Sequence, residues 1–294
     1  MDFQSIALPT ELWYLRCFAS AKIQLFSILL QKKIFFFIIS FLSLIISIFA
    51  KKVLMSHIIT IDIGNTRAKY AIFKNDEIIE TATFNPYNND LKEVVKKYPT
   101  ITRGILSSVG GKIEECLKQM EGIEVFILSG SAPLPFKMGY NDKEQIGSDR
   151  LVAVAAAMME KPKQNSLVID IGTCITYDII TSDDTHYGGP ISPGIRLRFK
   201  SMNDYTDKLP LCSPSKEENK IICSSTEECL QSGVLMAISF EIEGFIKMYS
   251  NIYKDLNVFI IGGDNIFFEN QLKNCIFADS KFTFKGLKFI LDYQ

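Results

Sequence analysis

Two stretches of the chain arrange apolar and polar positions in the same order. The first has apolar runs at residues 57–61 and 68–73, and the second has them at residues 166–169 and 175–180. A glycine-containing polar turn separates the two runs of each stretch, and a second polar turn follows. Apolar runs of this length, divided by turn residues, predict strand, tight turn, strand, turn, strand in both stretches.

The tight turns of the two stretches have the same sequence. Ile61-Asp62-Ile63-Gly64 recurs as Ile169-Asp170-Ile171-Gly172, 108 residues later. Glycine lets backbone N–H groups approach phosphate oxygens closely, whereas the aspartate is compatible with phosphate only if a cation lies between them. One such turn is common, but two in the same context favour a nucleotide phosphate site. The strand-to-helix glycine motifs of other nucleotide folds are absent from the sequence.

Two helices are predicted near further candidate residues. The alanine-rich residues 151–159 indicate a helix that begins close to Asp149. Ser225 and Glu228 form a capping-box pattern, which predicts a helix from Thr226 to about residue 249. Gly233 inside that helix is unfavourable compared with alanine, so we expect a close approach to another segment there.

The apolar segment at residues 34–50 differs from the rest of the chain. It carries no charge, lysines flank it on both sides, and its 17 residues are at the lower limit for a membrane span. A membrane anchor, a buried helix and translation that really begins at Met55 are the three explanations. The third is favoured, because a core strand would follow Met55 almost at once.

Composition excludes several classes of site. The net charge is −1 without a long run of one sign, so nothing indicates nucleic-acid binding. The seven cysteines include no C-x-x-C pair and read as reduced thiols of a cytoplasmic protein. The only histidines, His57 and His186, are far apart in the sequence, which argues against a zinc site.

From Met55 to Gln294 the sequence resembles the type III pantothenate kinases, within the superfamily of sugar and acetate kinases, heat-shock ATPases and actin. Five motifs in order carry the resemblance: Asp62–Thr66, Gly147–Arg150, Asp170–Thr173, Gly188–Gly194, and Thr226 with Gly233. One departure is Ile261 before Gly262-Gly263, where the family usually has threonine. The hydroxyl lost there could weaken a nucleotide contact, but the two glycines remain.

The resemblance implies an α/β fold of two actin-like (ribonuclease-H-like) domains. Each would have a mixed five-stranded sheet, and ATP would lie in the cleft between the domains. We expect a hydrophobic extension at residues 1–55, an N-terminal domain at 56–162 and a C-terminal domain at 163–294. The polar residues 161–165 are the expected junction.

The resemblance also assigns site residues. Asp149 would be the general base, although an aspartate near a helix start is often only a cap. Asp170 would hold a monovalent cation, potassium or ammonium. The expected ATP contacts are Asp62, Ile63, Gly64, Asn65, Thr66, Arg67, Ala68, Lys69 and Thr173. The expected substrate contacts are Tyr140, Gly147, Ser148, Asp149, Arg150 and Thr226.

Several of these residues have alternative explanations from the sequence. Lys69 could point at phosphate or face solvent, and Tyr140 could be a half-buried loop aromatic. Arg150 suits an anion contact through its planar guanidinium, or it could be a solvated helix residue. Cys174, beside Thr173, has no paired base in view and is interpreted as a small core residue.

The function implied is phosphorylation of pantothenate by ATP with magnesium, the first step of coenzyme A synthesis. Two alternatives stay open: an actin-like regulatory protein that binds nucleotide without this activity, and a kinase for another hydroxylated acid. The resemblance implies a homodimer. No nucleic-acid partner is expected, and membrane contact is expected only if residues 34–50 are a real anchor.

Overall fold

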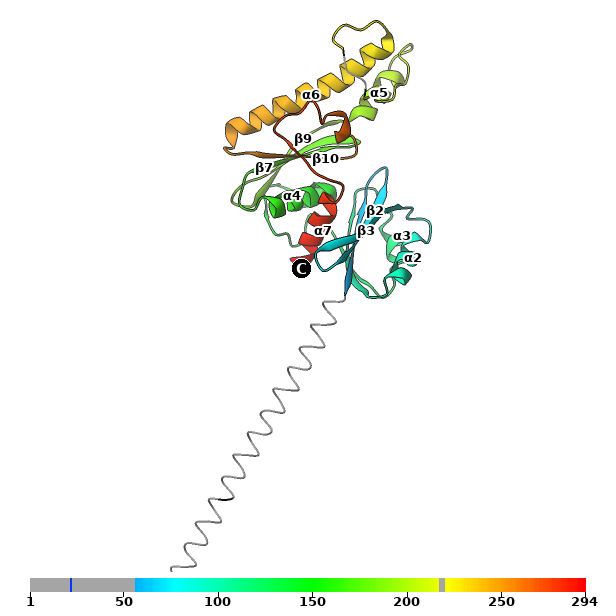
Figure 1. The fold of residues 1–294 in the computed structure, drawn as a ribbon, viewed down its shortest axis with the longest axis vertical. Coiled ribbons are helices and arrows are strands. Elements are labelled where there is room, and N and C mark those ends of the chain that lie inside the picture. Colours follow the sequence, from blue (N-terminus) through cyan, green and yellow to red (C-terminus); the bar gives the residue numbers. More distant parts are fainter. Residues whose placement is uncertain (1–21, 23–55, 217–219) are drawn as a thin grey trace, which may run out of the picture. The chain divides into compact units, whose positions relative to one another are not determined.

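The computed structural model describes Lys22, residues 56–216 and residues 220–294. The chain divides into two units, residues 1–56 and residues 57–294, and the fold below is that of the second unit (Figure 1). The apolar segment at residues 34–50 lies outside the described residues. The three explanations for it therefore stay predictions.

The first sheet is mixed and has five strands in the order β3-β2-β1-β4-β5. Strands β1, β2 and β3 are antiparallel neighbours, whereas β4 is parallel to both β1 and β5. The predicted succession of strand, glycine turn, strand, turn and strand is confirmed here. The strands are β1 (His57–Ile63), β2 (Ala68–Lys74), β3 (Glu77–Phe84), β4 (Ile101–Ser108) and β5 (Glu124–Ile127).

The second sheet repeats this order and adds a strand. Its order is β11-β10-β7-β8-β9-β6, so β9-β8-β7-β10-β11 corresponds to β3-β2-β1-β4-β5, with the same parallel and antiparallel pairs. The internal repeat in the sequence is thus a repeat in structure. The strands are β6 (Lys137–Met138), β7 (Ser166–Ile171), β8 (Cys174–Ile180), β9 (Thr185–Pro193), β10 (Asn257–Ile261) and β11 (Ile276–Phe277).

The expectation of five strands in the second sheet was wrong, because the sheet has six. The extra strand β6 comes from before the predicted junction and pairs in parallel with β9, Lys137 opposite Thr185 and Met138 opposite His186. This pairing covers backbone groups that would otherwise be free at the edge of β9. Two residues give no recognisable alternation, so this strand depends on tertiary contacts.

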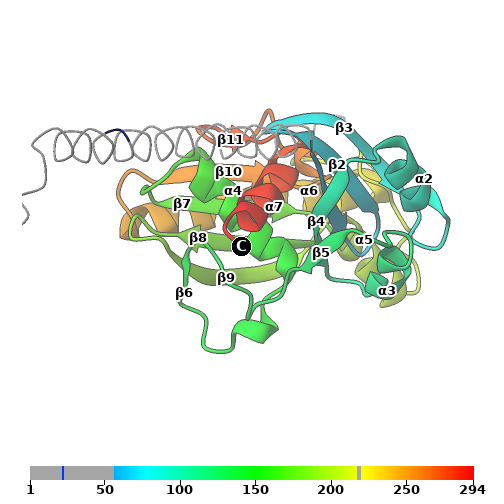
Figure 2. The same cartoon turned by 90° about the horizontal axis from the view of Figure 1, so that it is seen from below.

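Helices α4 (Ser148–Glu160) and α7 (Phe282–Asp292) pack against each other and against both sheets, and Figure 2 shows them side by side. One buried cluster joins side chains of both helices to Phe73 and Ile105 of the first sheet and to Val168 and Phe259 of the second. Small side chains make this possible, since a Cβ added at Gly286 of α7 would lie 2.4 Å from the Val152 carbonyl oxygen of α4.

The other face of each sheet is covered by helices. Helices α2 (Asp90–Lys97) and α3 (Ile113–Leu117) share a buried cluster with the first sheet. Helices α5 (Ile195–Asp204) and α6 (Thr226–Ile252) share one with the second sheet. Two 3₁₀ turns complete the elements, η1 (Lys143–Gln145) and η2 (Asn265–Phe267).

Helix α6 begins at Thr226 as predicted and ends three residues beyond residue 249. Ser225 is its N-cap and accepts a hydrogen bond from the Glu228 backbone N–H at 3.2 Å, while Glu228 accepts one from the Ser224 N–H at 2.7 Å. Gly233 was expected to allow a close approach, and this was wrong. The residue is exposed, and nothing lies within 4 Å of a Cβ built on it.

Among the described residues, α6 alone is long and apolar enough to span a membrane by length and composition. Its side chains Leu230, Val234, Ile238 and Ile242 are buried against the second sheet. Helix α6 is therefore accounted for as a core helix of this fold.

The predicted junction at residues 161–165 falls between the end of α4 and the start of β7. Strand β6 and helix α7 both contact the sheet on the other side of this junction in sequence. The division of the chain into domains at residues 162 and 163 stays a prediction.

Candidate functional site

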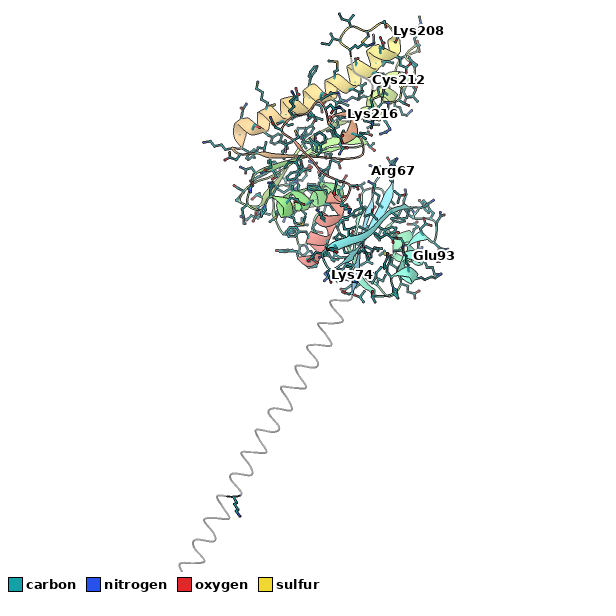
Figure 3. The ribbon with its side chains drawn as sticks, in the orientation of Figure 1. Arg67, Lys74, Glu93, Lys208, Cys212 and Lys216 are labelled. Carbon is teal, nitrogen blue, oxygen red and sulfur yellow. The ribbon has the colours of Figure 1, made fainter. Side chains whose placement is uncertain are left out.

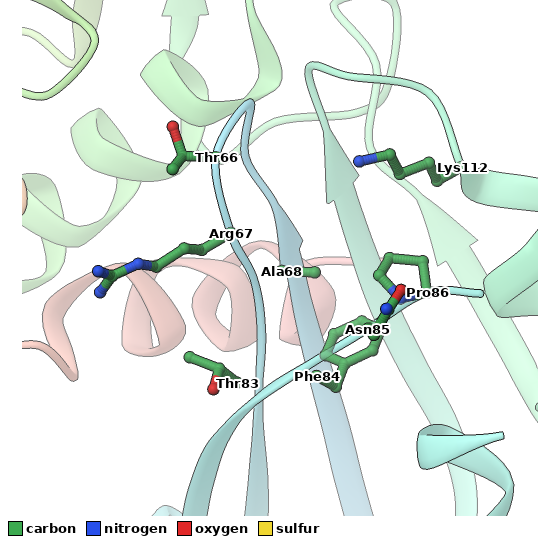
Figure 4. A pocket seen from close by; sticks show the side chains of 8 residues that line it. All are labelled: Thr66, Arg67, Ala68, Thr83, Phe84, Asn85, Pro86 and Lys112. Atoms are coloured by element: carbon green, nitrogen blue, oxygen red, sulfur yellow. The ribbon is translucent and has the colours of Figure 1, made fainter. Parts of the chain in front are cut away.

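The first glycine turn joins β1 to β2. The Gly64 N–H donates a hydrogen bond to the Arg67 carbonyl oxygen at 3.0 Å, which closes the turn and leaves Asn65, Thr66 and Arg67 exposed. Figure 4 shows Thr66 and Arg67 at this turn. A hollow of about 460 Å³ beside the turn is lined by Thr66, Arg67, Ala68, Thr83, Phe84, Asn85, Pro86 and Lys112.

The second glycine turn joins β7 to β8 and is one residue shorter than the first. The Gly172 N–H donates to the Cys174 carbonyl oxygen at 3.0 Å, and Thr173 is exposed at the tip. Cys174 is exposed too, so its interpretation as a core residue was wrong. It stands at the first position of β8, where the side chain points away from the core that Ile175 enters.

Gly262 brings the end of β10 onto this second turn. Its φ of +98° is in the region that favours glycine, and an added Cβ would lie 2.4 Å from Asp170 Oδ1. The Asp264 N–H then donates to the Ile171 carbonyl oxygen at 3.1 Å. Ile261, which replaces the threonine usual in the family, is buried in the core between the sheets.

Asp62 and Asp170 are the next-to-last residues of β1 and β7, and the pKa of each carboxyl is raised. Burial, opposed by Lys69 and increased by the negative charge of Asp149, raises the pKa of Asp62 to about 6. Burial, with the charges of Asp149 and Asp62 added, raises the pKa of Asp170 to about 7. The three carboxylates are therefore close enough to repel one another. Lys69, half-buried on β2, is the cation that offsets them both.

A cation is the ligand that this pair of carboxylates favours, because it would lower the cost of ionising both. Over residues 56–216 and 220–294, however, no three His, Cys, Asp or Glu side chains come together as a metal site. A cation held by Asp62 and Asp170 would need further oxygen ligands, and phosphate oxygens or water are suitable.

Asp149 lies in the first turn of α4, whose N-cap is Gly147. The Ser148 hydroxyl donates to the Ser108 carbonyl oxygen at 3.2 Å and accepts from the Ser107 hydroxyl at 2.9 Å, which fastens the start of α4 to the end of β4. Asp149 Oδ1 accepts from the Arg150 backbone N–H at 2.9 Å, inside the first turn and not from the N-cap position. Burial is the main cause that raises the pKa of Asp149 above its usual range.

The Arg150 side chain is buried and crosses to the second sheet. Its Nε donates to Asp178 Oδ2 at 2.8 Å, and its Nη2 donates to the carbonyl oxygens of Tyr177 at 3.2 Å and Gly189 at 3.4 Å. The other oxygen of Asp178 bonds His186 Nε2 at 2.8 Å. Arg150 is thus no solvated helix residue. Its predicted substrate contact stays a prediction.

Asp178 and His186 were not among the site residues predicted from the sequence. Their only signals were a charge inside the apolar residues 175–180 and one of two histidines in the chain. Neither signal identifies a partner. The ion pair forms between β8 and α4, and its members are 28 residues apart in sequence.

Tyr140, Arg150 and Gly188 converge at one place. A Cβ added at Gly188 would lie 2.5 Å from a carbon of the half-buried Tyr140 ring and 3.4 Å from Arg150 Nη2. Tyr140 and Arg150, both expected to contact substrate, thus meet at Gly188. Thr226 does not join them by any contact among the described residues, since it is exposed at the start of α6.

Known proteins resemble this chain in sequence and in fold. The family model for type III pantothenate kinase matches residues 58–248. The chain belongs to the type III pantothenate kinase family. A type III pantothenate kinase from Christiangramia forsetii is 40% identical over 241 residues, which are 80% of this chain and 98% of that protein. One from Phocaeicola vulgatus is 41% identical over 237 residues, 80% of this chain and 97% of that protein.

A solved structure also resembles this chain. It is described as a Baf family transcriptional activator from Campylobacter jejuni, with a TM-score of 0.53 and 22% identity over 80% of this chain and 97% of that chain. At this identity the likeness shows a shared fold only. The membership of the kinase family rests on the sequence match and makes this chain a kinase.

Proposed function

We propose that this protein transfers the γ-phosphoryl group of ATP to pantothenate, the first step of coenzyme A synthesis. The observation that carries the proposal is that Asp62 and Asp170, beside the two repeated glycine turns, lie close enough to Asp149 at the start of α4 for its charge to raise the pKa of both. The relatives from Christiangramia forsetii and Phocaeicola vulgatus, 40% and 41% identical to this chain, are named for this activity. Phosphoryl transfer needs mainly positioning and charge neutralisation, which these elements can provide.

In this proposal ATP lies between two actin-like domains, with the two glycine turns facing its phosphates. Backbone N–H groups of the first turn and the side chains of residues 62–69 would contact the phosphates, and Thr173 would contact them from the second turn. Lys69 supports the arrangement, since its charge acts on both Asp62 and Asp170.

Asp149 is proposed as the general base. It would take the proton from the primary hydroxyl of pantothenate, and the oxygen would attack the γ-phosphoryl group. A carboxyl whose pKa is raised by burial is a stronger base than an exposed aspartate. The fixed position of α4, through Ser148 and β4, would hold this carboxylate in place. Tyr140 and the Gly147–Arg150 segment would contact the substrate.

Asp62 and Asp170 are proposed to hold cations together with the phosphate oxygens. Magnesium and a monovalent ion, potassium or ammonium, would neutralise charge there. The two carboxylates fit this role because each has a raised pKa and both lie at strand ends beside a glycine turn. Asp170 is assigned the monovalent ion.

A coupled assay of ADP release tests the proposal. Rates are compared with and without pantothenate, and with potassium, ammonium or sodium as the only monovalent cation. We expect release that depends on pantothenate and is faster with potassium or ammonium than with sodium. ATP binding without such release would favour a regulatory protein. Release with another hydroxylated acid alone would favour a different kinase, and equal rates in sodium would contradict the monovalent site.

Two further proposals follow from family membership. The protein is expected to act as a homodimer, and light scattering at assay concentration measures this directly, a monomeric mass being the contrary result. It is also expected in the cytoplasm, without nucleic-acid partners. Cell fractionation tests the location, and membrane contact would require residues 34–50 to be an anchor.

A further inference from the structure

The interior of the second sheet contains a carboxylate that the proposed mechanism does not use. Asp178, on β8, is 1% exposed and bonds two buried side chains, Arg150 and His186, which are 6% and 0% exposed. Fully buried charges are uncommon and are normally paired. The pairing here matters because Arg150 directly follows Asp149 in the first turn of α4.

The bonds of Arg150 fix its guanidinium on several sides. Asp178 binds Nε at 2.8 Å, and the carbonyl oxygens of Tyr177 and Gly189 receive bonds from Nη2. The same Nη2 lies 3.4 Å from the position of a Cβ on Gly188, where the Tyr140 ring also contacts. Asp178 therefore helps to fix the position of the guanidinium edge that lies nearest Tyr140.

His186 holds Asp178 from the opposite side. Its Nε2 lies 2.8 Å from Asp178 Oδ1, whereas its Nδ1 is buried without a hydrogen-bond partner in the described part of the chain. Because a carboxylate only accepts, the ring must donate through Nε2–H. An unpaired buried ring nitrogen is unfavourable, so an apolar side chain would suit the space better if the bond to Asp178 had no purpose.

Stability alone is a weak explanation for this network. Buried ion pairs contribute little net stability, because the cost of desolvating two charges offsets their attraction. A buried ion pair does hold its two side chains in one defined geometry. Here the pair holds Arg150, which directly follows the proposed base Asp149.

We propose that Asp178 is a positioning residue for phosphoryl transfer. It acts through Arg150, fixing the guanidinium and, with it, the first turn of α4 and the substrate face formed with Tyr140. His186 in turn fixes the carboxylate of Asp178. The inference rests on the proposed kinase function and adds to it a residue that does not touch substrate.

The test is a double-mutant cycle of Asp178→Asn and Arg150→Met. With Asp178→Asn alone, we expect kcat/KM for pantothenate to fall by about 10- to 100-fold, because displacements near 1 Å can have such effects. The dissociation constant for ATP should change by less than about twofold. In the Arg150→Met background the same change should lower kcat/KM by less than about threefold, since non-additivity reports that the two residues act together.

Asp183→Asn is the matched control. Asp183 lies in the turn after β8, is exposed, and within the described part of the chain its side chain accepts hydrogen bonds from the neighbouring hydroxyls of Thr181 and Thr185. Its kinetics should equal those of the wild type. Wild-type kcat/KM in folded Asp178→Asn protein, or a full additive loss in the Arg150→Met background, would overturn the proposal.

Two substitutions of His186 cover the case in which Asp178→Asn does not fold. His186→Gln retains an N–H donor for Asp178 and should keep kcat/KM within about threefold of the wild type, whereas His186→Phe should lower it by about tenfold. Equal activity of two folded His186 variants would overturn the proposal.

A nuclear magnetic resonance measurement separates this proposal from the proposed function. The Arg150 Nε–H, buried and bonded, should exchange slowly and be visible in the wild type. It should be lost or strongly shifted in folded Asp178→Asn protein, or in His186→Phe protein if Asp178→Asn does not fold. An unchanged signal contradicts the positioning role even if pantothenate is not the substrate. Absence of pantothenate-dependent ADP release in the wild type contradicts only the proposed function.

Discussion

Asp149 is subject to two requirements at once, since it accepts a backbone hydrogen bond in the first turn of α4 and is the proposed base. The bond from the Arg150 N–H favours the ionised carboxylate, whereas burial disfavours it more strongly. Because the folded-state pKa is raised, the protonated form favours folding, and that contribution is lost as pH rises through the folded pKa. The ionised form of Asp149, which the proposed base needs, therefore lowers the free energy of unfolding.

Asp149→Asn should separate these two roles. We expect kcat to fall by about 10²–10⁴-fold, the usual contribution of a general base, while ATP still binds. The melting temperature of the ligand-free variant at pH 8 should equal or exceed that of the wild type, and the difference should shrink toward low pH. Wild-type kcat should itself decline as pH falls through a pKa above 3.8. Near wild-type turnover by the purified variant would exclude Asp149 as the base.

Gly188→Ala tests the substrate face. The added methyl group would lie 2.5 Å from a Tyr140 ring carbon, so the ring or β9 must move. We expect KM for pantothenate to rise by about tenfold, with a smaller change in KM for ATP, since one displaced contact is worth roughly 1–2 kcal/mol. Steady-state kinetics with each substrate varied in turn measure this. An unchanged KM for pantothenate would mean that Tyr140 and Gly188 do not line the substrate site.

At the scale of elements, the sequence predicts the parts that have strong local patterns. Strands β1 and β7 are apolar runs that lead into the glycine turns, β2 and β8 are apolar runs that follow them, and the start of α6 follows from its capping pattern. Strand β6 has no such pattern, because two residues beside β9 are defined only by tertiary pairing. The role of Asp178 could not be predicted either, because its partner Arg150 lies on another element and is brought near only by the tertiary fold.

Two glycines also show that the local sequence does not reveal contacts made by the tertiary fold. Gly233 faces open space, whereas Gly262 lies against Asp170 with a φ of +98°. Sequence alone predicted a close approach at Gly233, which the structure contradicts. The need for glycine at Gly262 comes from the neighbouring strand, which no local pattern reveals.

Gly233→Ala should therefore stabilise α6. The residue is exposed in a helix interior with room for a methyl group, and alanine is favoured over glycine there by about 1 kcal/mol. We expect the free energy of unfolding in urea to rise by roughly 0.5–1 kcal/mol with an unchanged denaturant slope and unchanged kinetics. A fall in stability would show that this position is covered, for example by a second copy of the chain.

At the scale of the whole molecule, the family model matches the kinase fold without the first fifty-odd residues. The relatives from Christiangramia forsetii and Phocaeicola vulgatus are covered over 98% and 97% of their lengths by 80% of this chain. The family model begins at residue 58, and β1 begins at His57. Every residue of the proposed site is Asp62 or later.

A shortened chain that begins at Met55 is therefore expected to be soluble, folded and fully active. Its kcat/KM should lie within about twofold of the value for the full chain, because none of the proposed contacts is removed. If residues 34–50 span a membrane, the full chain will fractionate with membranes and resist extraction by high salt, while the shortened chain will not. N-terminal sequencing of the native protein then decides between an anchor and a start at Met55. An inactive or unfolded shortened chain would show that residues before Met55 belong to the functional fold.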